Sequence, residues 1–101
     1  MYSDVFFTER RGFMKIKEGF MLRTVAGQTI VVPVGNAAVS FNGMISLNES
    51  GAFLWNKLSE ENDRNGLINA LLEEYDVTIE LASCGVDMFL KKIREAKLLD
   101  E

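Results

Sequence analysis

The spacing of apolar residues changes once along the chain, near residue 48, and no other feature of the sequence constrains the fold as strongly. Before residue 48, short runs rich in β-branched residues alternate with turn residues, which is typical of antiparallel strands. After it, apolar residues recur at spacings of three and four, which is typical of helices that bury one face. Strands followed by helices predict an α+β domain.

The strand-rich half begins with a predicted hairpin. Residues 20–25 and 29–34 are the expected strands, and residues 26–28, which include a glycine, form the turn between them. Pro33 has no N–H to donate to a neighbouring strand. We therefore expect it at the end of its strand or at the edge of the sheet.

A second hairpin is expected further on. Residues 38–41 and 44–47 flank Asn42-Gly43, and both turn residues accept the positive φ that a type I′ turn requires. Together the two hairpins predict an N-terminal antiparallel sheet of three or four short strands.

Three helices are expected in the second half. Asn48, Asp63 and Thr78 each precede an apolar stripe and are predicted to cap a helix. A sheet followed by three helices, the last two joined by a short turn, resembles a helix-turn-helix with an attached sheet. The expected buried positions are Leu47, Gly51, Leu54, Trp55 and Leu58; Leu67, Ile68, Leu71, Leu72 and Tyr75; and Ala82, Val86, Phe89, Leu90 and Ile93, with Leu98 and Leu99 closing the chain.

The N-terminal segment carries no such pattern. Residues 1–13 show no hydrophobic period, so we expect a loosely ordered tail followed by one domain over residues 14–101. Met14 is as acceptable a native start as Met1, and the sequence leaves the choice open.

The residue inventory argues against catalysis. There is no histidine, and Cys84 is the only cysteine, so the commonest general base, the commonest metal ligand and any disulfide within the chain are missing. A 101-residue chain also has little room for a core together with a deep substrate cavity. We therefore predict a protein that is not an enzyme, with no catalytic residue, no metal site and no cofactor.

Charge and hydropathy limit the partners and the location. The net charge is −4, whereas nucleic acids and anionic membranes call for a basic face. No apolar run approaches the roughly 18–20 residues that span a bilayer, and the N-terminus does not resemble a signal peptide. A single thiol suits a reducing compartment. We expect a cytoplasmic protein that binds neither nucleic acid nor membrane.

The helix-turn-helix arrangement nevertheless raises DNA binding as an interpretation. A recognition helix reads bases with its first residues, which here include Ile79, Glu80 and Leu81. None of these side chains pairs with base edges, and Glu80 repels phosphate. DNA binding is therefore the least favoured of three interpretations.

Several segments resemble the coenzyme PQQ synthesis protein D (PqqD-like) family. The run Leu47-Asn48-Glu49-Ser50-Gly51-Ala52-Phe53-Leu54-Trp55 is similar to the family's signature at the start of its first helix. Residues 71–77 resemble the end of its second helix. The apolar spacing of the third helix and the terminal Leu98-Leu99 also fit, and the resemblance covers residues 16–99.

The resemblance implies a function. Family members are winged-helix-like RiPP recognition elements, which bind the leader part of a ribosomally made precursor peptide and present it to a modifying enzyme, often a radical S-adenosylmethionine enzyme. The leader adds as a strand to the sheet edge before the first helix and lies against the third helix. The chain is thus expected to act as a peptide chaperone, in PQQ biosynthesis or in another pathway of this kind.

The same resemblance places the peptide-binding residues. The docking strand would be Met44, Ile45, Ser46 and Leu47, and the facing helix would contribute Leu81, Cys84, Met88 and Lys92 at spacings of three and four, with Lys91 beside them. Lys91, Lys92 and Lys97 would hold an acidic leader. Alternatives stay open: Leu81 and Met88 widen the core stripe, Cys84 serves packing, and the three lysines are simply solvated.

Three features depart from the family's pattern. Gly85 stands where many members have aspartate, which predicts a kink or a close backbone approach in the third helix. Lys97 stands where a helix-ending glycine is usual. The insertion over residues 34–42 would cover the docking edge if the strand at 38–41 pairs with 44–47. A second interpretation is therefore a structural subunit of an enzyme complex, or a homodimer, that uses this edge and binds no leader.

Overall fold

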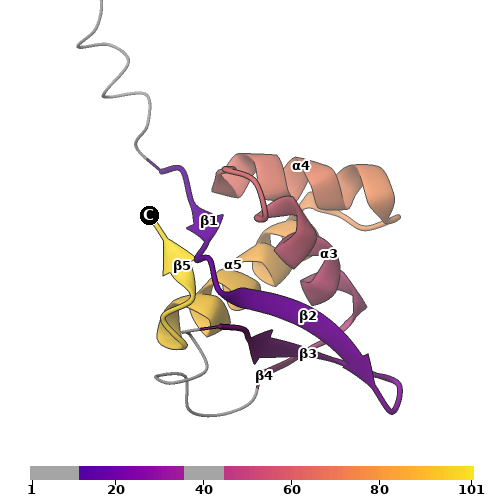
Figure 1. The fold of residues 1–101 in the computed structure, drawn as a ribbon. Helices are drawn as coiled ribbons and strands as arrows, with labels where there is room; N and C mark the ends of the chain where they lie inside the picture. Colours follow the sequence, from indigo (N-terminus) through magenta and orange to yellow (C-terminus); the bar gives the residue numbers. More distant parts are fainter. Residues whose placement is uncertain (1–11, 36–44) are drawn as a thin grey trace, which may run out of the picture.

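A computed structural model describes residues 12–35 and 45–101 and confirms the α+β class. An antiparallel sheet of order β2-β3-β4 is formed by Phe20–Val25, Gln28–Pro33 and Ile45–Leu47. The helices α3 (Glu49–Lys57), α4 (Arg64–Glu74) and α5 (Ile79–Glu95) follow in the order that the sequence predicts. Figure 1 shows the β2–β3 hairpin projecting from the side of the helical part.

The first hairpin has a tighter turn than predicted. Val25 pairs with Gln28, so only Ala26 and Gly27 lie between the strands, with φ values of 53° and 80°. Two successive positive φ values are what a type I′ turn requires. Pro33 ends β3, as predicted.

The second predicted hairpin is described only in part. Its strand at 38–41, its Asn42-Gly43 turn and Met44 lie outside the described residues. Residues 45–47 form β4, which pairs antiparallel with β3 through Thr29, Ile30 and Val31. Whether a further strand covers the other edge of β4 therefore stays a prediction.

All three predicted caps are present. The side chains of Asn48, Asp63 and Thr78 each accept a hydrogen bond from the backbone N–H three residues further on, at 2.8, 2.8 and 3.2 Å. Each bond satisfies an N–H that has no partner within its helix, and this fixes where the helix begins.

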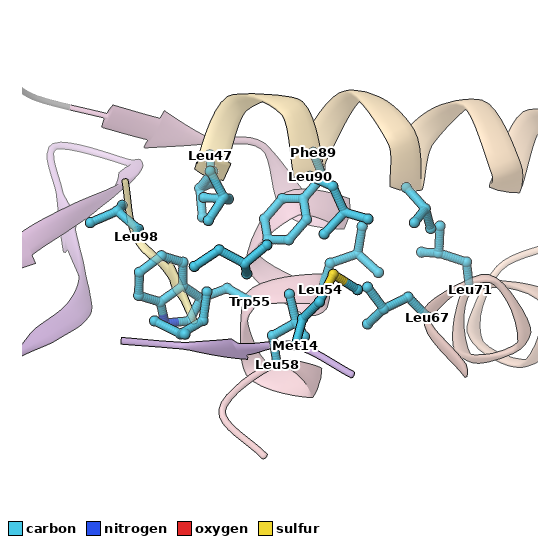
Figure 2. Packing of buried hydrophobic residues seen from close by; sticks show 14 of the residues in the cluster. Met14, Leu47, Leu54, Trp55, Leu58, Leu67, Leu71, Phe89, Leu90 and Leu98 are labelled. Carbon is cyan, nitrogen blue, oxygen red and sulfur yellow. The ribbon is translucent and has the colours of Figure 1, made fainter. Parts of the chain in front are cut away.

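The core lies between the helices and the inner face of the sheet, as Figure 2 shows for its central side chains. Leu54, Leu58 and Ile93 are at most 1% exposed, and Trp55 is a core residue at 4%. Of the predicted positions, Leu72 and Tyr75 are half-buried and pack against this cluster, and the others are buried. Among the described residues, no helix is long and apolar enough to cross a membrane.

A second small sheet was not predicted. Strand β1 (Lys15–Ile16) pairs antiparallel with β5 (Leu99–Asp100), beside the C-terminus in Figure 1. Met14 precedes it, is 3% exposed, and exchanges backbone hydrogen bonds of 2.7 and 2.9 Å with Asn62. The start of the predicted domain is thus anchored to the core, whereas residues 1–11 of the predicted tail lie outside the described residues.

Lys97 resolves the question of how α5 ends. Its φ is +62°, the left-handed conformation that glycine usually provides. The N–H of Lys97 donates to the carbonyl of Arg94, and the N–H of Leu98 donates to that of Ile93. These are the two bonds of a Schellman cap, formed here without a glycine.

Candidate functional site

The backbone of β4 offers hydrogen-bonding groups on the side away from β3. The Ser46 carbonyl accepts a 2.6 Å hydrogen bond from Lys92 Nζ of α5. In an antiparallel strand, the N–H and the C=O of one residue point to the same side. Ser46 is the register partner of Ile30 in β3, but its carbonyl points to α5, so we infer that its N–H does so too. The backbone groups of Ile45 and Leu47 then point to β3, because the direction alternates along a strand.

A groove of about 400 Å³ runs between this edge and α5. It is bounded by β4, by the first turns of α3, which follow β4 directly, and by the middle of α5. Its lining residues are Ser46, Leu47, Asn48, Ser50, Gly51, Leu54, Gly85, Met88, Phe89 and Lys92.

The groove has an apolar floor and one charged end. Leu54 and Phe89 are 1% and 6% exposed, so they belong to both the floor and the core. Met88 stands at the rim, 68% exposed. The ammonium of Lys92 lies beside the Ser46 backbone. This arrangement suits an extended peptide, whose backbone needs hydrogen-bonding partners and whose alternate side chains need apolar surface.

The structure brings five of the nine predicted binding residues to β4 or the groove. Ile45 is half-buried in β4, Ser46 and Leu47 line the groove from the strand, and Met88 and Lys92 line it from the helix. Leu47 is only 7% exposed, so its side chain serves the core more than the surface. Met44 is outside the described residues.

The remaining predicted residues lie along the exposed flank of α5. Cys84 is exposed, with its Sγ 3.9 Å from Met88 Sδ. Leu81, one turn earlier, is 63% exposed. The alternative in which Leu81 and Met88 widen the buried stripe is therefore wrong. Lys91 is exposed and is not among the residues that line the groove.

Sequence reasoning missed six of the ten lining residues: Asn48, Ser50, Gly51, Leu54, Gly85 and Phe89. One signal was available, the glycine inside a predicted helix. The close backbone approach expected at Gly85 is wrong, since an added Cβ would meet only Leu71 Cδ1, at 4.0 Å. Helix α5 runs unbroken from 79 to 95.

The charged pairs lie away from the groove lining. Arg64 binds both carboxylate oxygens of Asp87, at 2.7 and 3.0 Å, and thereby joins α4 to α5. This guanidinium holds the pKa of Asp87 below its usual range. Within residues 12–35 and 45–101, no group of three potential metal ligands is found.

Fold and groove together define a class of small α+β domains. In this class a short sheet leads into three helices, and a groove lies between the strand before the first of these helices and the last helix. The family model described as coenzyme PQQ synthesis protein D (PqqD) matches residues 23–99, and the chain belongs to this family. Among solved structures, TbiB1 in complex with the TbiA(beta) leader peptide has a similar fold, with a TM-score of 0.64 and 17% identity over 85% of this chain and 94% of that chain. No curated protein sequence matches the chain significantly.

Proposed function

We propose that the chain binds the leader segment of a ribosomally made precursor peptide by strand addition to β4. It then presents the peptide to a modifying enzyme and is itself a non-catalytic module. The observation that carries the proposal is the backbone of Ser46, which borders the groove and whose carbonyl is bonded to Lys92 of α5. Membership of the PqqD family and the similarity to a leader-bound structure support it.

The binding step follows from the edge geometry. An incoming strand gains an N–H and a C=O partner at Ser46, and each such bond contributes about 0.5–1.5 kcal/mol net. Alternate side chains of the strand then face α5 and bury apolar area against Met88 and Phe89. Lys92 releases the Ser46 carbonyl as the peptide's N–H arrives, and its ammonium becomes available to an acidic group of the peptide.

The partner enzyme is proposed from the family alone. A radical S-adenosylmethionine enzyme is the expected partner, and the pathway is PQQ synthesis or another pathway that modifies a ribosomal peptide. A short leader-bearing reading frame and such an enzyme gene beside this gene would support the assignment.

The test is an amide NMR titration of the labelled protein with synthetic leader peptides from neighbouring reading frames. Saturable shifts at residues 44–47 and along α5 are expected. Hydrogen exchange sharpens the test: bound peptide should newly protect the Ser46 N–H, whereas Ile45 and Leu47 are already protected by β3. If no leader perturbs this surface, the peptide-carrier function is to be abandoned.

The edge of β4 away from β3 favours one alternative function. A second copy of the chain, or the enzyme itself, would use the Ser46 backbone in the same way, which makes the protein a structural subunit. Dimerisation that rises with concentration, in a protein without affinity for any leader, would select this alternative.

A further inference from the structure

Two glycines line the groove from opposite helices, and packing explains only one of them. A Cβ at Gly51 would lie 3.1 Å from Asn48 Oδ1 and 3.3 Å from Leu47 Cβ, so the capped start of α3 would have to shift by a few tenths of an ångström to accept it. A Cβ at Gly85 would meet only Leu71 Cδ1, at an ordinary 4.0 Å. Gly85 also has no positive φ to require glycine.

The fold therefore gains nothing from glycine at position 85. Inside a helix, glycine is less favourable than alanine, because it loses more backbone entropy on folding. Alanine would fit without strain, since its Cβ would make only an ordinary van der Waals contact, with Leu71. A residue that weakens its helix without helping the packing points to a role in the groove that it lines.

What Gly85 provides there is a notch with apolar walls. Leu81, Met88 and Phe89 lie one turn away on the same side of α5, at positions i−4, i+3 and i+4. Side chains on a helix lean toward its N-terminus, so Met88 and Phe89 flank the surface above residue 85. Leu54 of α3 lines the same groove from the other side.

We infer that Gly85 determines specificity by leaving room for an apolar side chain, aliphatic or aromatic, of the peptide that adds to β4. The inference deepens the proposed function and rests on it. The charged residue of the lining, Lys92, lies two helical turns from Gly85 on α5 and is bonded to the strand edge. An acidic side chain of the peptide therefore has its partner at that end, and the notch is left to an apolar one.

Gly85→Ala separates this role from a structural one, because its two effects have opposite signs. Higher helix propensity should raise the midpoint of thermal unfolding by about 3–6 °C. The extra methyl in the notch should weaken binding of a leader peptide about tenfold. Gly85→Leu, which fills the notch, should weaken binding further. Ser83→Ala, a control on the other flank of α5, should raise stability while leaving affinity unchanged.

A double-mutant cycle then identifies the occupant. Each apolar residue of the bound synthetic leader is replaced by alanine and titrated against the wild type and Gly85→Leu, and one position should lose affinity in the wild type only. If Gly85→Leu binds as tightly as the wild type, or no position couples to it, the inference is overturned while the proposed function stands. If the wild type binds no leader peptide, both fall together.

Discussion

Three methionines of the chain occupy very different environments, and truncating each tests how stability and recognition are divided. Met14 is 3% exposed beside the β1–β5 sheet, Met21 is 48% exposed on β2, and Met88 is 68% exposed at the rim of the groove. Each Met→Ala change removes the same three heavy atoms. Differences in the outcome therefore report the environment rather than the chemistry of the substitution.

The structure sets the expected magnitudes. At about 0.8 kcal/mol per buried methylene-sized group, Met14→Ala loses roughly 2.4 kcal/mol of transfer free energy. The cavity that remains brings the total to about 2–4 kcal/mol. The free energy of unfolding of a chain of this length is about 5–15 kcal/mol, so Met14→Ala would remove a large fraction of the protein's stability. Met88→Ala should stay within about 0.5 kcal/mol of the wild type, and Met21→Ala should cost little more.

Urea titration followed by the fluorescence of Trp55 measures all three variants, because this single tryptophan is buried in the core. Met14→Ala should lower the urea midpoint by about 1–2 M. Met88→Ala should unfold like the wild type yet bind leader peptide more weakly. Equal losses of stability at Met14 and Met88 would refute the assignment of one to the core and the other to the groove.

Three further predictions concern the end of α5, its ion pair with α4 and its charged groove residue. Lys97→Gly should raise the unfolding free energy by about 1 kcal/mol in urea titrations, because glycine adopts the left-handed conformation at this position without steric cost. A lower unfolding free energy would mean that the Lys97 side chain supports the cap. Arg64 lowers the pKa of Asp87 in the folded state, so the ion pair stabilises the fold at pH values above the pKa of Asp87 in the unfolded chain. This contribution is lost as the pH falls through the lower pKa that Asp87 has in the folded protein. Asp87→Asn should make the unfolding free energy depend slightly less on pH; the effect is small because the side chains of Arg64 and Asp87 are about half exposed (49% and 54%). An unchanged dependence of the unfolding free energy on pH, between pH 6 and 2.5, would argue against a contribution from this pair. Calorimetry at two salt concentrations should show a larger loss of affinity for an acidic leader in Lys92→Met than in Lys91→Met, and equal losses would remove Lys92 from the site.

The helices could be predicted from the sequence because their determinants are local. A capping side chain and the N–H that it binds are three residues apart, and a buried stripe repeats within a few turns. The hairpin turn at Ala26-Gly27 is local in the same sense. The pairing of β1 with β5 is not, since two-residue strands carry no period and their partners are more than eighty residues apart.

Only part of the groove could be predicted, again because some of its determinants are local in the sequence and others are not. The exposed flank of α5 follows from helical spacing once the core stripe is known, and so Met88 and Lys92 could be predicted. The wall formed by Asn48, Ser50 and Gly51 depends on where α3 packs against α5, which a one-dimensional pattern does not contain. Gly85 was noticed, but the close backbone approach expected there is absent. A glycine that leaves room for a ligand, as we propose, looks the same in a sequence as one that lets two backbones approach.

Helix α5 carries the core and the groove on adjoining faces, and this decides which residues can report on binding. Ala82, Val86 and Ile93 are at most 1% exposed, whereas Met88 at the rim is 68% exposed. Changes at the rim can therefore alter peptide selectivity while the core keeps its packing. Phe89 belongs to both faces, since it lines the groove and is 6% exposed. Its truncation would cost about 3–5 kcal/mol of stability, so a loss of binding there could not be separated from unfolding. The division between fold and recognition has to be tested at Gly85 and Met88, where the structure predicts that affinity falls while stability rises or holds.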